Sequence, residues 1–282
     1  MLQASMNRRF AIQGCTALVT GATAGLGAEF ARQLAPRARH LILVGRRKER
    51  LASLAESLRK DFSALSIESI PADLAMPEER ERLASHIIRS EIPLNLLVNN
   101  AGLGDLGPFD TAEWTRLEPM LSVNVTALTH LTHLLLPMLR AHPPSAVLNV
   151  SSIAGFFPLP EMAVYAATKA YVTSFSEALR MELEPHGVVV TALCPGPVPT
   201  EFFEVASREG KTIRAMDRSH PAFASPPELV VRQALAGLER NRPGVIPNSL
   251  LAAVVRTVRL LPFPLIREAI RLGAGPKKPV EE

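Results

Sequence analysis

The feature that most constrains the fold is an alternation between short apolar runs and longer segments with helical spacing. The apolar runs are rich in β-branched residues, which is typical of strands, and they span Thr16–Thr20, His40–Val44, Ile67–Ile70, Leu94–Val98, Ala146–Val150 and Val188–Leu193, with a short seventh run at 244–246. Helical spacing lies near 25–35, 47–60, 77–90, 111–141, 161–184 and 227–240. Strands that alternate with helices form parallel sheets whose two faces are both covered. The sequence therefore predicts an α/β fold, a doubly wound Rossmann-type parallel sheet of six to seven strands with helices on both faces.

Composition narrows the class of protein. The 282 residues contain no internal repeat or linker, so we expect a single domain over 1–282. The net charge is +4, but outside the C-terminal segment there is no basic stripe with aromatic residues, and we expect no nucleic-acid partner. The two cysteines, Cys15 and Cys194, lack the spacing of a metal site, so no metal is expected.

The same features bear on location. Few cysteines fit a reducing compartment. The first residues lack the apolar core of a signal peptide, and no uncharged apolar run is long enough to span a bilayer. We therefore expect a cytoplasmic protein.

A glycine-rich segment follows the first predicted strand and opens a helix. It reads TGATAGLG over residues 20–27, which is neither the GxGxxG of other dinucleotide folds nor a phosphate-binding Walker loop. Glycines permit a tight turn and close approach of a pyrophosphate to the free N–H groups of a helix N-terminus. An ordinary glycine turn is the alternative.

Basic residues follow the second strand, where enzymes that select NAD usually place an acidic residue. The segment Gly45-Arg46-Arg47-Lys48 puts three cations at a helix start, which opposes the helix dipole. A bound 2′-phosphate would reverse that balance. We predict NADP(H), with Arg46 as the first contact and Arg47 as the second. NAD(H) is the alternative cofactor, and a solvated basic helix start is the alternative interpretation.

Polar residues also follow the third and fourth strands. Asp73 can accept a hydrogen bond from an adenine amino group, or it can cap the next helix. The segment 99–102, Asn-Asn-Ala-Gly, can close a turn or brace a cofactor.

Tyr165, Lys169 and Ser152 form the strongest candidate catalytic set. Tyr165 and Lys169 are four residues apart, which places them on one face of a helix. A phenol with a pKa of about 10 is a poor base at neutral pH, and a nearby ammonium favours its ionised form. Ser152, at the end of the fifth strand, can hold a substrate oxygen. A surface lysine beside a core tyrosine is the alternative.

With these motifs in order, the sequence resembles the short-chain dehydrogenase/reductase family, in its compact single-domain branch. The resemblance covers roughly residues 14–246. The motifs that carry it are TGATAGLG (20–27), Asp73-Leu74, NNAG (99–102), Asn124 in Val123-Asn124-Val125, Ser152 in NVSSIAG, YAATK (165–169) and PGPVPT (195–200).

The resemblance implies a catalytic tetrad. Tyr165 would be the acid/base, Lys169 would lower its pKa and bind the nicotinamide ribose, and Ser152 rather than Ser151 would polarise the carbonyl. Asn124 would hold a water in a proton relay, although a satisfied helix-interior amide is the alternative. The cofactor-binding residues it implies, with the arginines above, are Gly21, Thr23, Ala24, Gly25, Leu26, Gly27, Arg46, Arg47, Asp73, Leu74, Asn100, Ala101, Gly102, Tyr165, Lys169, Pro195, Gly196, Val198 and Thr200.

The family's variable substrate lid would span about residues 200–226. Five apolar residues near Ser152 and in the lid could line an apolar slot, namely Phe156, Phe157, Met162, Phe202 and Phe203. Core packing is the alternative. We expect an apolar, lipid-like or steroid-like carbonyl or secondary alcohol as the substrate.

The C-terminal extension, about residues 248–282, is basic and amphipathic. Six basic side chains and one acidic side chain lie between Asn248 and Lys278. Such a segment can lie on an anionic membrane surface, but we favour packing on the subunit or on a second subunit. By resemblance, Leu128–Leu139 and the helix after Tyr165 are candidate surfaces of a homodimer or homotetramer.

These features together predict an NADP(H)-dependent oxidoreductase that interconverts a carbonyl and a secondary alcohol. A catalytically silent nucleotide-sensing protein of the same fold is the first alternative, and a scaffold attached to a membrane by its tail is the second. An intact tetrad argues against pure binding, which does not need Tyr165.

Overall fold

The structure is a computed structural model of the 282-residue chain, and it describes residues 9–208 and 223–273. In this part of the chain a parallel sheet has the strand order β3-β2-β1-β4-β5-β6-β7. The strands are β1 (Thr16–Thr20), β2 (His40–Gly45), β3 (Ser66–Pro71), β4 (Leu96–Asn99), β5 (Ser145–Val150), β6 (Val188–Leu193) and β7 (Gly244–Val245). The order reverses between β1 and β4, which is where ligands bind in open α/β sheets. The predicted doubly wound parallel sheet is confirmed.

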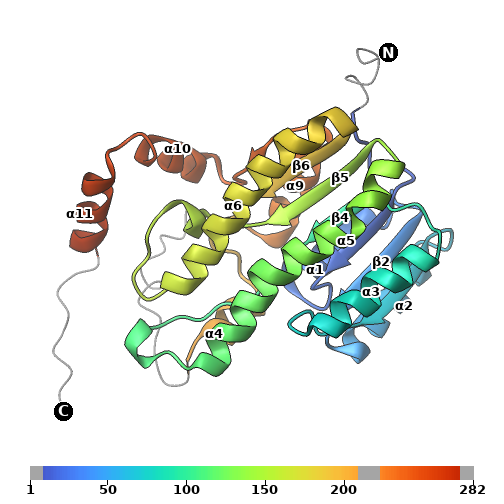
Figure 1. Cartoon of the computed structure of the whole chain (residues 1–282), viewed down its shortest axis with the longest axis horizontal. Helices are drawn as coiled ribbons and strands as arrows, with labels where there is room; N and C mark the ends of the chain where they lie inside the picture. Colours follow the sequence, from blue (N-terminus) through green and yellow to red (C-terminus); the bar gives the residue numbers. More distant parts are fainter. Residues whose placement is uncertain (1–8, 209–222, 274–282) are drawn as a thin grey trace.

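Helices cover both faces of the sheet (Figure 1). One layer holds α1 (Gly25–Leu34), α2 (Lys48–Asp61) and α9 (Pro227–Glu239), and the other holds α3 (Pro77–Arg89), α5 (Leu128–Ala141) and α6 (Ala163–Leu183). Successive strand residues serve opposite layers, so Ala17 and Val19 pack with α1 while Leu18 packs on the other side. This two-sided burial explains why the strands are apolar throughout.

The predicted helix at 111–141 differs in the structure. A short turn η2 (Phe109–Thr111) precedes α4 (Trp114–Leu121), and a π-helical segment η3 (Ser122–Ala127) separates α4 from α5. Asn124 lies in this segment and exchanges two hydrogen bonds with the backbone of Leu103, at 2.8 and 2.9 Å. π-Helical turns insert extra backbone at functional sites. The apolar spacing predicted the helix but not this break.

Three helices beyond the sheet complete the described chain. They are α7 (Glu201–Ala206), α10 (Ser249–Val258) and α11 (Phe263–Gly273), and short turns η4 (Ile153–Phe156) and η5 (Glu184–His186) flank α6. Of the predicted lid at 200–226, residues 209–222 lie outside the described residues, as do 274–282 of the extension. Within the part that is described, no helix has both the length and the apolar character needed to cross a bilayer.

Candidate active site

The glycine turn lies at the carboxyl end of β1, next to the point where the strand order reverses. Gly21 and Gly25 have positive φ angles of +68° and +52°, which favour glycine. A Cβ at Gly27 would lie 2.1 Å from the carbonyl oxygen of Gly21, so a side chain there cannot be accommodated. The turn therefore packs closely against the first turn of α1, and the N-terminus of that helix fits a dinucleotide pyrophosphate.

The segment after β4 braces this turn. Asn100 donates from its backbone N–H to the Thr20 hydroxyl at 3.0 Å and from its side chain to the Thr20 carbonyl at 2.9 Å. Ala101 donates to the same hydroxyl at 3.0 Å. Gly102 lies beside Lys169, because a Cβ there would be 3.5 Å from the Lys169 Nζ. The NNAG segment thus connects the glycine turn to Lys169.

Asp73 and Leu74 follow β3 at the same edge of the sheet. One carboxylate oxygen of Asp73 accepts a hydrogen bond from the backbone N–H of Ala75 at 3.0 Å, and Leu74 is buried. Asp73 therefore closes the turn before α3 and does not cap that helix, whose N-cap is Met76. Its contact with an adenine stays a prediction.

The two arginines after β2 point to different places. Arg46 is exposed, whereas Arg47 reaches the glycine turn and donates to the Thr23 hydroxyl at 3.3 and 3.4 Å. The sequence analysis ranked Arg46 first and Arg47 second. Arg47, at the N-cap of α2, is therefore the one that contacts the glycine turn, and which of the two arginines meets a 2′-phosphate stays a prediction.

A carboxylate from the lid neighbours these cations. Glu201, the first residue of α7, accepts hydrogen bonds from Arg47 at 2.9 Å and from Arg50 at 2.7 Å. These hydrogen bonds hold the pKa of Glu201 below its ordinary value. The sequence analysis missed both Glu201 and Arg50, because 151 residues separate them along the chain.

Tyr165, Lys169 and Ser152 come together as predicted from their spacing. Tyr165 and Lys169 project from α6, and both side chains are buried. The Lys169 Nζ lies 5.7 Å from the centre of the Tyr165 ring and donates to the Val150 carbonyl at 2.9 Å. Ser152 follows β5, accepts a hydrogen bond from the Ala154 N–H at 3.1 Å and is hydrogen-bonded to the phenol.

Burial changes the proton affinities of this set. It raises the pKa of Tyr165 to about 12, against the opposing hydrogen bond with Ser152. It lowers the pKa of Lys169 to about 8. The sequence analysis expected the ammonium to make the phenol more acidic, but in the protein chain itself desolvation is the larger effect. The phenol is therefore neutral at pH 7, which is the form that can donate a proton to a reduced carbonyl oxygen.

The structure distinguishes Ser152 from its neighbour. Ser151 is buried and its hydroxyl donates to the Lys169 carbonyl at 2.8 Å, so it holds α6 against β5. Asn124 is also fully hydrogen-bonded, to Leu103 and to the Thr168 hydroxyl at 3.0 Å. Its amide positions the segment after β4, and its role in a proton relay stays a prediction.

The segment after β6 closes the site. Pro195 and Val198 are buried, and Gly196 packs so closely that a Cβ would lie 2.5 Å from Leu251 of α10. Thr200 caps α7 through the Phe202 N–H and lies over the glycine turn, since a Cβ at Gly25 would be 3.3 Å from it. Thr200 thus links this segment to the glycine turn, and the contact of these four residues with a cofactor stays a prediction.

An apolar cluster surrounds the phenol. The Phe202 ring lies 5.5 Å from the Tyr165 ring, and Met162 packs against the same cluster. Phe203 meets Phe202 edge-on at 5.5 Å. Phe156 and Phe157 form their own edge-on pair on the turn after Ser152. Phe202 thus contacts the Tyr165 ring directly, Met162 packs against the same cluster and Phe203 contacts Phe202, whereas Phe156 and Phe157 contact each other.

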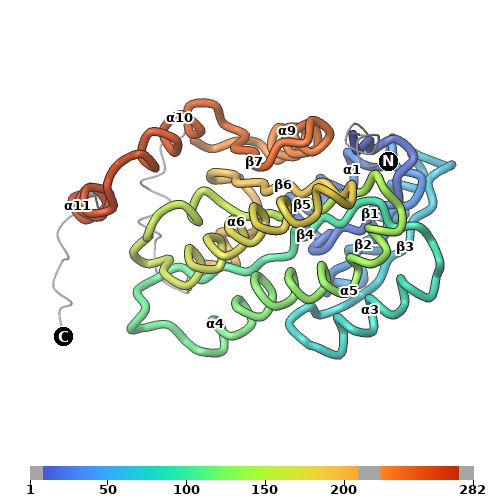
Figure 2. Tube along the Cα trace, turned by 45° about the horizontal axis from the view of Figure 1, so that its top comes forward, coloured from blue at the N-terminus to red at the C-terminus, as the bar shows by residue number. Residues whose placement is uncertain are grey.

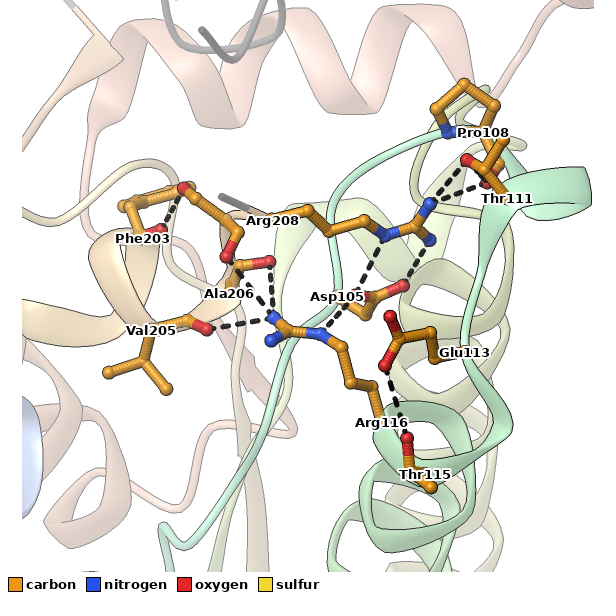
Figure 3. Close-up of polar contacts among 11 residues, drawn as sticks. Asp105, Pro108, Thr111, Glu113, Thr115, Arg116, Phe203, Val205, Ala206 and Arg208 are labelled. Carbon is orange, nitrogen blue, oxygen red and sulfur yellow. Dashed lines mark hydrogen bonds and ion pairs between the residues drawn. The ribbon is translucent and has the colours of Figure 1, made fainter. Parts of the chain in front are cut away.

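A buried ion-pair network holds the end of α7, and the sequence analysis missed it (Figure 3). Asp105, 2% exposed at its side chain, pairs with Arg116 of α4 at 2.8 Å and with Arg208. Arg116 also donates to the carbonyls of Val205 and Ala206 at 3.0 and 3.2 Å. Burial alone would raise the pKa of Asp105, but hydrogen bonds from Arg208 and Arg116 outweigh it and keep this pKa below its ordinary value.

The consequence of this network is that α7 is held at both ends. Glu201 ties its first residue to the arginines beside the glycine turn, and Asp105 ties its last turn to α4. Phe202 lies between these two ends of α7, and its ring packs against the ring of Tyr165. No sequence signal marks the network, because 103 residues separate Asp105 from Arg208.

Metal-binding side chains do not gather anywhere in residues 9–208 and 223–273: no three or more His, Cys, Asp or Glu residues are placed to hold an ion.

Comparisons with known proteins agree with this geometry. The profile of a family described as short chain dehydrogenase matches residues 15–210. A very-long-chain 3-oxoacyl-CoA reductase of Anas platyrhynchos is 30% identical over 249 residues, which are 86% of this chain and 75% of the relative. A sulfoacetaldehyde reductase of Chromohalobacter salexigens is 37% identical over 196 residues, 66% of this chain and 73% of the relative.

A solved structure shares the fold over nearly the whole chain. It is a short-chain dehydrogenase from Sphingobium yanoikuyae in complex with NADPH, 30% identical, with a TM-score of 0.76 over 95% of this chain and 98% of that one. The family profile agrees with the glycine turn and with the buried pair of Tyr165 and Lys169. The chain therefore belongs to the short-chain dehydrogenase/reductase family, and it is an oxidoreductase of the kind that uses a nicotinamide cofactor.

Proposed function

We propose that the protein is an NADP(H)-dependent reductase that converts an apolar, lipid-like ketone to a secondary alcohol, with Tyr165 as the proton donor. The observation that carries the proposal is the buried, neutral phenol of Tyr165, which lies beside Ser152 and under an apolar lid. The bound cofactor would supply the hydride. The protein holds the carbonyl, excludes water and supplies the proton.

The residues around the cleft fit such a cofactor. The glycine turn and the N-terminus of α1 would hold the pyrophosphate, and Lys169 would reach the nicotinamide ribose. Arg47 would bind the 2′-phosphate, with Arg50 beside it. The NADPH in the structure from Sphingobium yanoikuyae supports this preference over NAD(H).

The apolar residues around the phenol favour a long apolar substrate over a small anionic one. The relatives named above act, by their names, on a very long acyl chain or on a small sulfonated aldehyde. Phe202 and Met162 flank the phenol with apolar surface. In addition, the nearby Arg116 and Arg208 are already engaged by Asp105. A long apolar 3-oxoacyl thioester therefore fits this lining better than a small anion.

The test is consumption of NADPH with 3-oxoacyl thioesters of short, medium and long chains, and with steroid ketones and sulfoacetaldehyde as comparisons. We expect kcat/KM to rise with chain length, because each buried methylene adds about 0.8 kcal/mol of binding. A preference for sulfoacetaldehyde would reject the apolar substrate. NADPH binding without oxidation of any ketone would favour the alternative, a silent nucleotide sensor.

Replacing Arg47 tests the cofactor preference. Arg47→Ala removes a charge-assisted contact with the 2′-phosphate, worth about 1.5–3 kcal/mol, so the Kd for NADPH should rise about 10- to 100-fold. The Kd for NADH should change little, because NADH has no phosphate there. Both constants follow from titrating the fluorescence of the reduced nicotinamide.

Arg46→Ala is the matched control, since it removes the same side chain one residue away. Its effect on NADPH should stay within about threefold, as expected for an exposed charge. Equal weakening of NADPH and NADH by Arg47→Ala, or a larger NADPH effect from Arg46→Ala, would contradict the assignment. Glu201→Gln should tighten NADPH, because it removes a carboxylate that competes for Arg47.

Assembly and location stay predictions. The outer side of α5 and α6 carries the stacked pair Tyr171 and Phe175 and the exposed Met181, and we propose that it pairs with a second copy in a dimer or tetramer. Both cysteines are free and buried, which agrees with a reducing, cytoplasmic setting.

A further inference from the structure

The helix pair α10–α11, here called the tail helices, exposes an unusual share of apolar surface. Seven of the fourteen large hydrophobic residues that are exposed in the described part of the chain lie between residues 250 and 272. They are Leu250, Val254, Leu260, Leu261, Phe263, Leu265 and Leu272, and the exposed fraction ranges from 40% to 84%. An exposed apolar patch of this kind marks an interaction surface.

The first of the tail helices is fixed to the body. Leu251, Ala252 and Val255 are buried, and Leu251 packs against Gly196 at the active-site edge. The Arg259 guanidinium lies 5.0 Å above the ring of Phe156. From this base, α11 lies at the end of the molecule opposite α2 and α3 in both views (Figures 1 and 2). The tail helices therefore begin beside the turn after β5, and α11 lies farther from the sheet (Figure 1).

The positive charge of the tail helices indicates that their partner is anionic. Residues 249–272 contain four arginines and one glutamate, and that glutamate, Glu268, pairs with Arg271 at 2.8 Å. In α11, Leu265 and Leu272 are seven residues apart and share a face, whereas Arg267 and Arg271 lie on the polar side. A basic polar face beside an apolar face is the pattern of helices that lie in the surface of a bilayer.

We propose that the tail helices are a docking surface for an anionic lipid membrane, with α11 lying in the interface. Leu260, Leu261, Leu265 and Leu272 would enter the acyl boundary, and the arginines would meet lipid phosphates. A second copy of the chain is a poorer occupant, because it would bring the same arginines to both sides of the contact.

The position of this surface adds a consequence that depends on the proposed function. Docking would hold Phe156 and its turn at the membrane, next to Ser152. An apolar ketone dissolved in the bilayer would then reach the site without crossing water. Membrane binding itself is measured without turnover, so the two proposals can fail separately.

The experiment is flotation of the full-length protein with lipid vesicles. We expect binding to vesicles that contain phosphatidylglycerol and much weaker binding to phosphatidylcholine alone. The double variant Leu265→Ser/Leu272→Ser should lose at least about tenfold in affinity, because two buried side chains no longer enter the bilayer. Arg267→Glu/Arg271→Glu should lose a similar factor, and only for the anionic vesicles.

The control is Met76→Ser/Ile88→Ser, which removes two similarly exposed apolar side chains at the two ends of α3. It should bind vesicles like the wild type, and thermal unfolding should show all three variants folded. Equal flotation of the wild type and the Leu265/Leu272 variant would overturn the proposal. So would wild-type dimers in sedimentation that become monomers in that variant without any vesicle binding, because the surface would then bind a second copy.

Discussion

Tyr165→Phe should abolish reduction and leave the rest of the molecule in place. We expect kcat/KM to fall by about a thousandfold or more, because general acid catalysis by a positioned group contributes up to roughly four orders of magnitude. The phenylalanine keeps the ring that packs against Phe202 and lies over Lys169. The Kd for NADPH should therefore stay within about twofold, and steady-state kinetics with nucleotide titration measure both quantities.

The chain supplies its own control, because its two tyrosines lie on the same helix. Tyr171 is 38% exposed and its hydroxyl contacts Thr129 at 2.8 Å, away from the cleft. Tyr171→Phe should retain the wild-type rate. If Tyr165→Phe kept more than a tenth of the activity, another group would have to donate the proton, and the proposed role of the phenol would be wrong.

Lys169→Met should cost turnover and should change how stability depends on pH. The ammonium lies 5.7 Å from the centre of the phenol ring, so its loss should lower kcat by about a hundredfold or more. The same charge is buried, and burial lowers its pKa from 10.5 to about 8. A shift of this size corresponds to a free-energy cost on the order of 3 kcal/mol for keeping the charge in the folded state.

The direction of the pH effect follows from the two proton affinities. Below pH 8 the lysine is protonated in both the folded and the unfolded chain, and the full cost is present. Between about pH 8 and 10.5 the unfolded chain binds the proton and the folded chain does not, so the free energy of unfolding rises with pH. Lys169→Met lacks this rise. Its stability relative to the wild type should therefore fall across this range.

Urea unfolding at several pH values between 7 and 10 measures this difference. Lys60→Met, which removes an exposed lysine of α2, should show a constant difference from the wild type. Parallel curves for the wild type and Lys169→Met would mean that Lys169 titrates near its ordinary pKa. That result would contradict the buried charge without bearing on catalysis, which the rate measurement tests separately.

Local patterns were enough to predict the elements but not their interruptions. The strand from Val188 to Leu193 has the same bounds in the structure as in the sequence analysis, because six apolar or small residues in a row need burial on both faces. The helix from 111 to 141 was predicted as unbroken. In its π-helical turn Asn124 donates hydrogen bonds to the Leu103 carbonyl and the Thr168 hydroxyl, and spacing along one helix cannot reveal them.

In the candidate site, too, the sequence predicted the local features but not the contacts between distant residues. The glycine turn, Tyr165, Lys169 and Ser152 were found from the sequence because a turn after a strand and two residues on one helix face are local geometry. Arg46 and Arg47 are neighbours with the same chemistry. The sequence could not show which of them contacts the glycine turn, because that depends on where the chain enters α2 and on the position of Thr23.

The sequence by itself determined the sheet, the glycine turn and the candidate catalytic side chains, since each follows from residues close together in the chain. Only the tertiary structure decided the proton affinities of Tyr165 and Lys169, the ion pairs of Asp105 at the end of α7 and the exposed face of the tail helices. The physical reason is that desolvation, ion pairing and exposure depend on which distant segments meet in space.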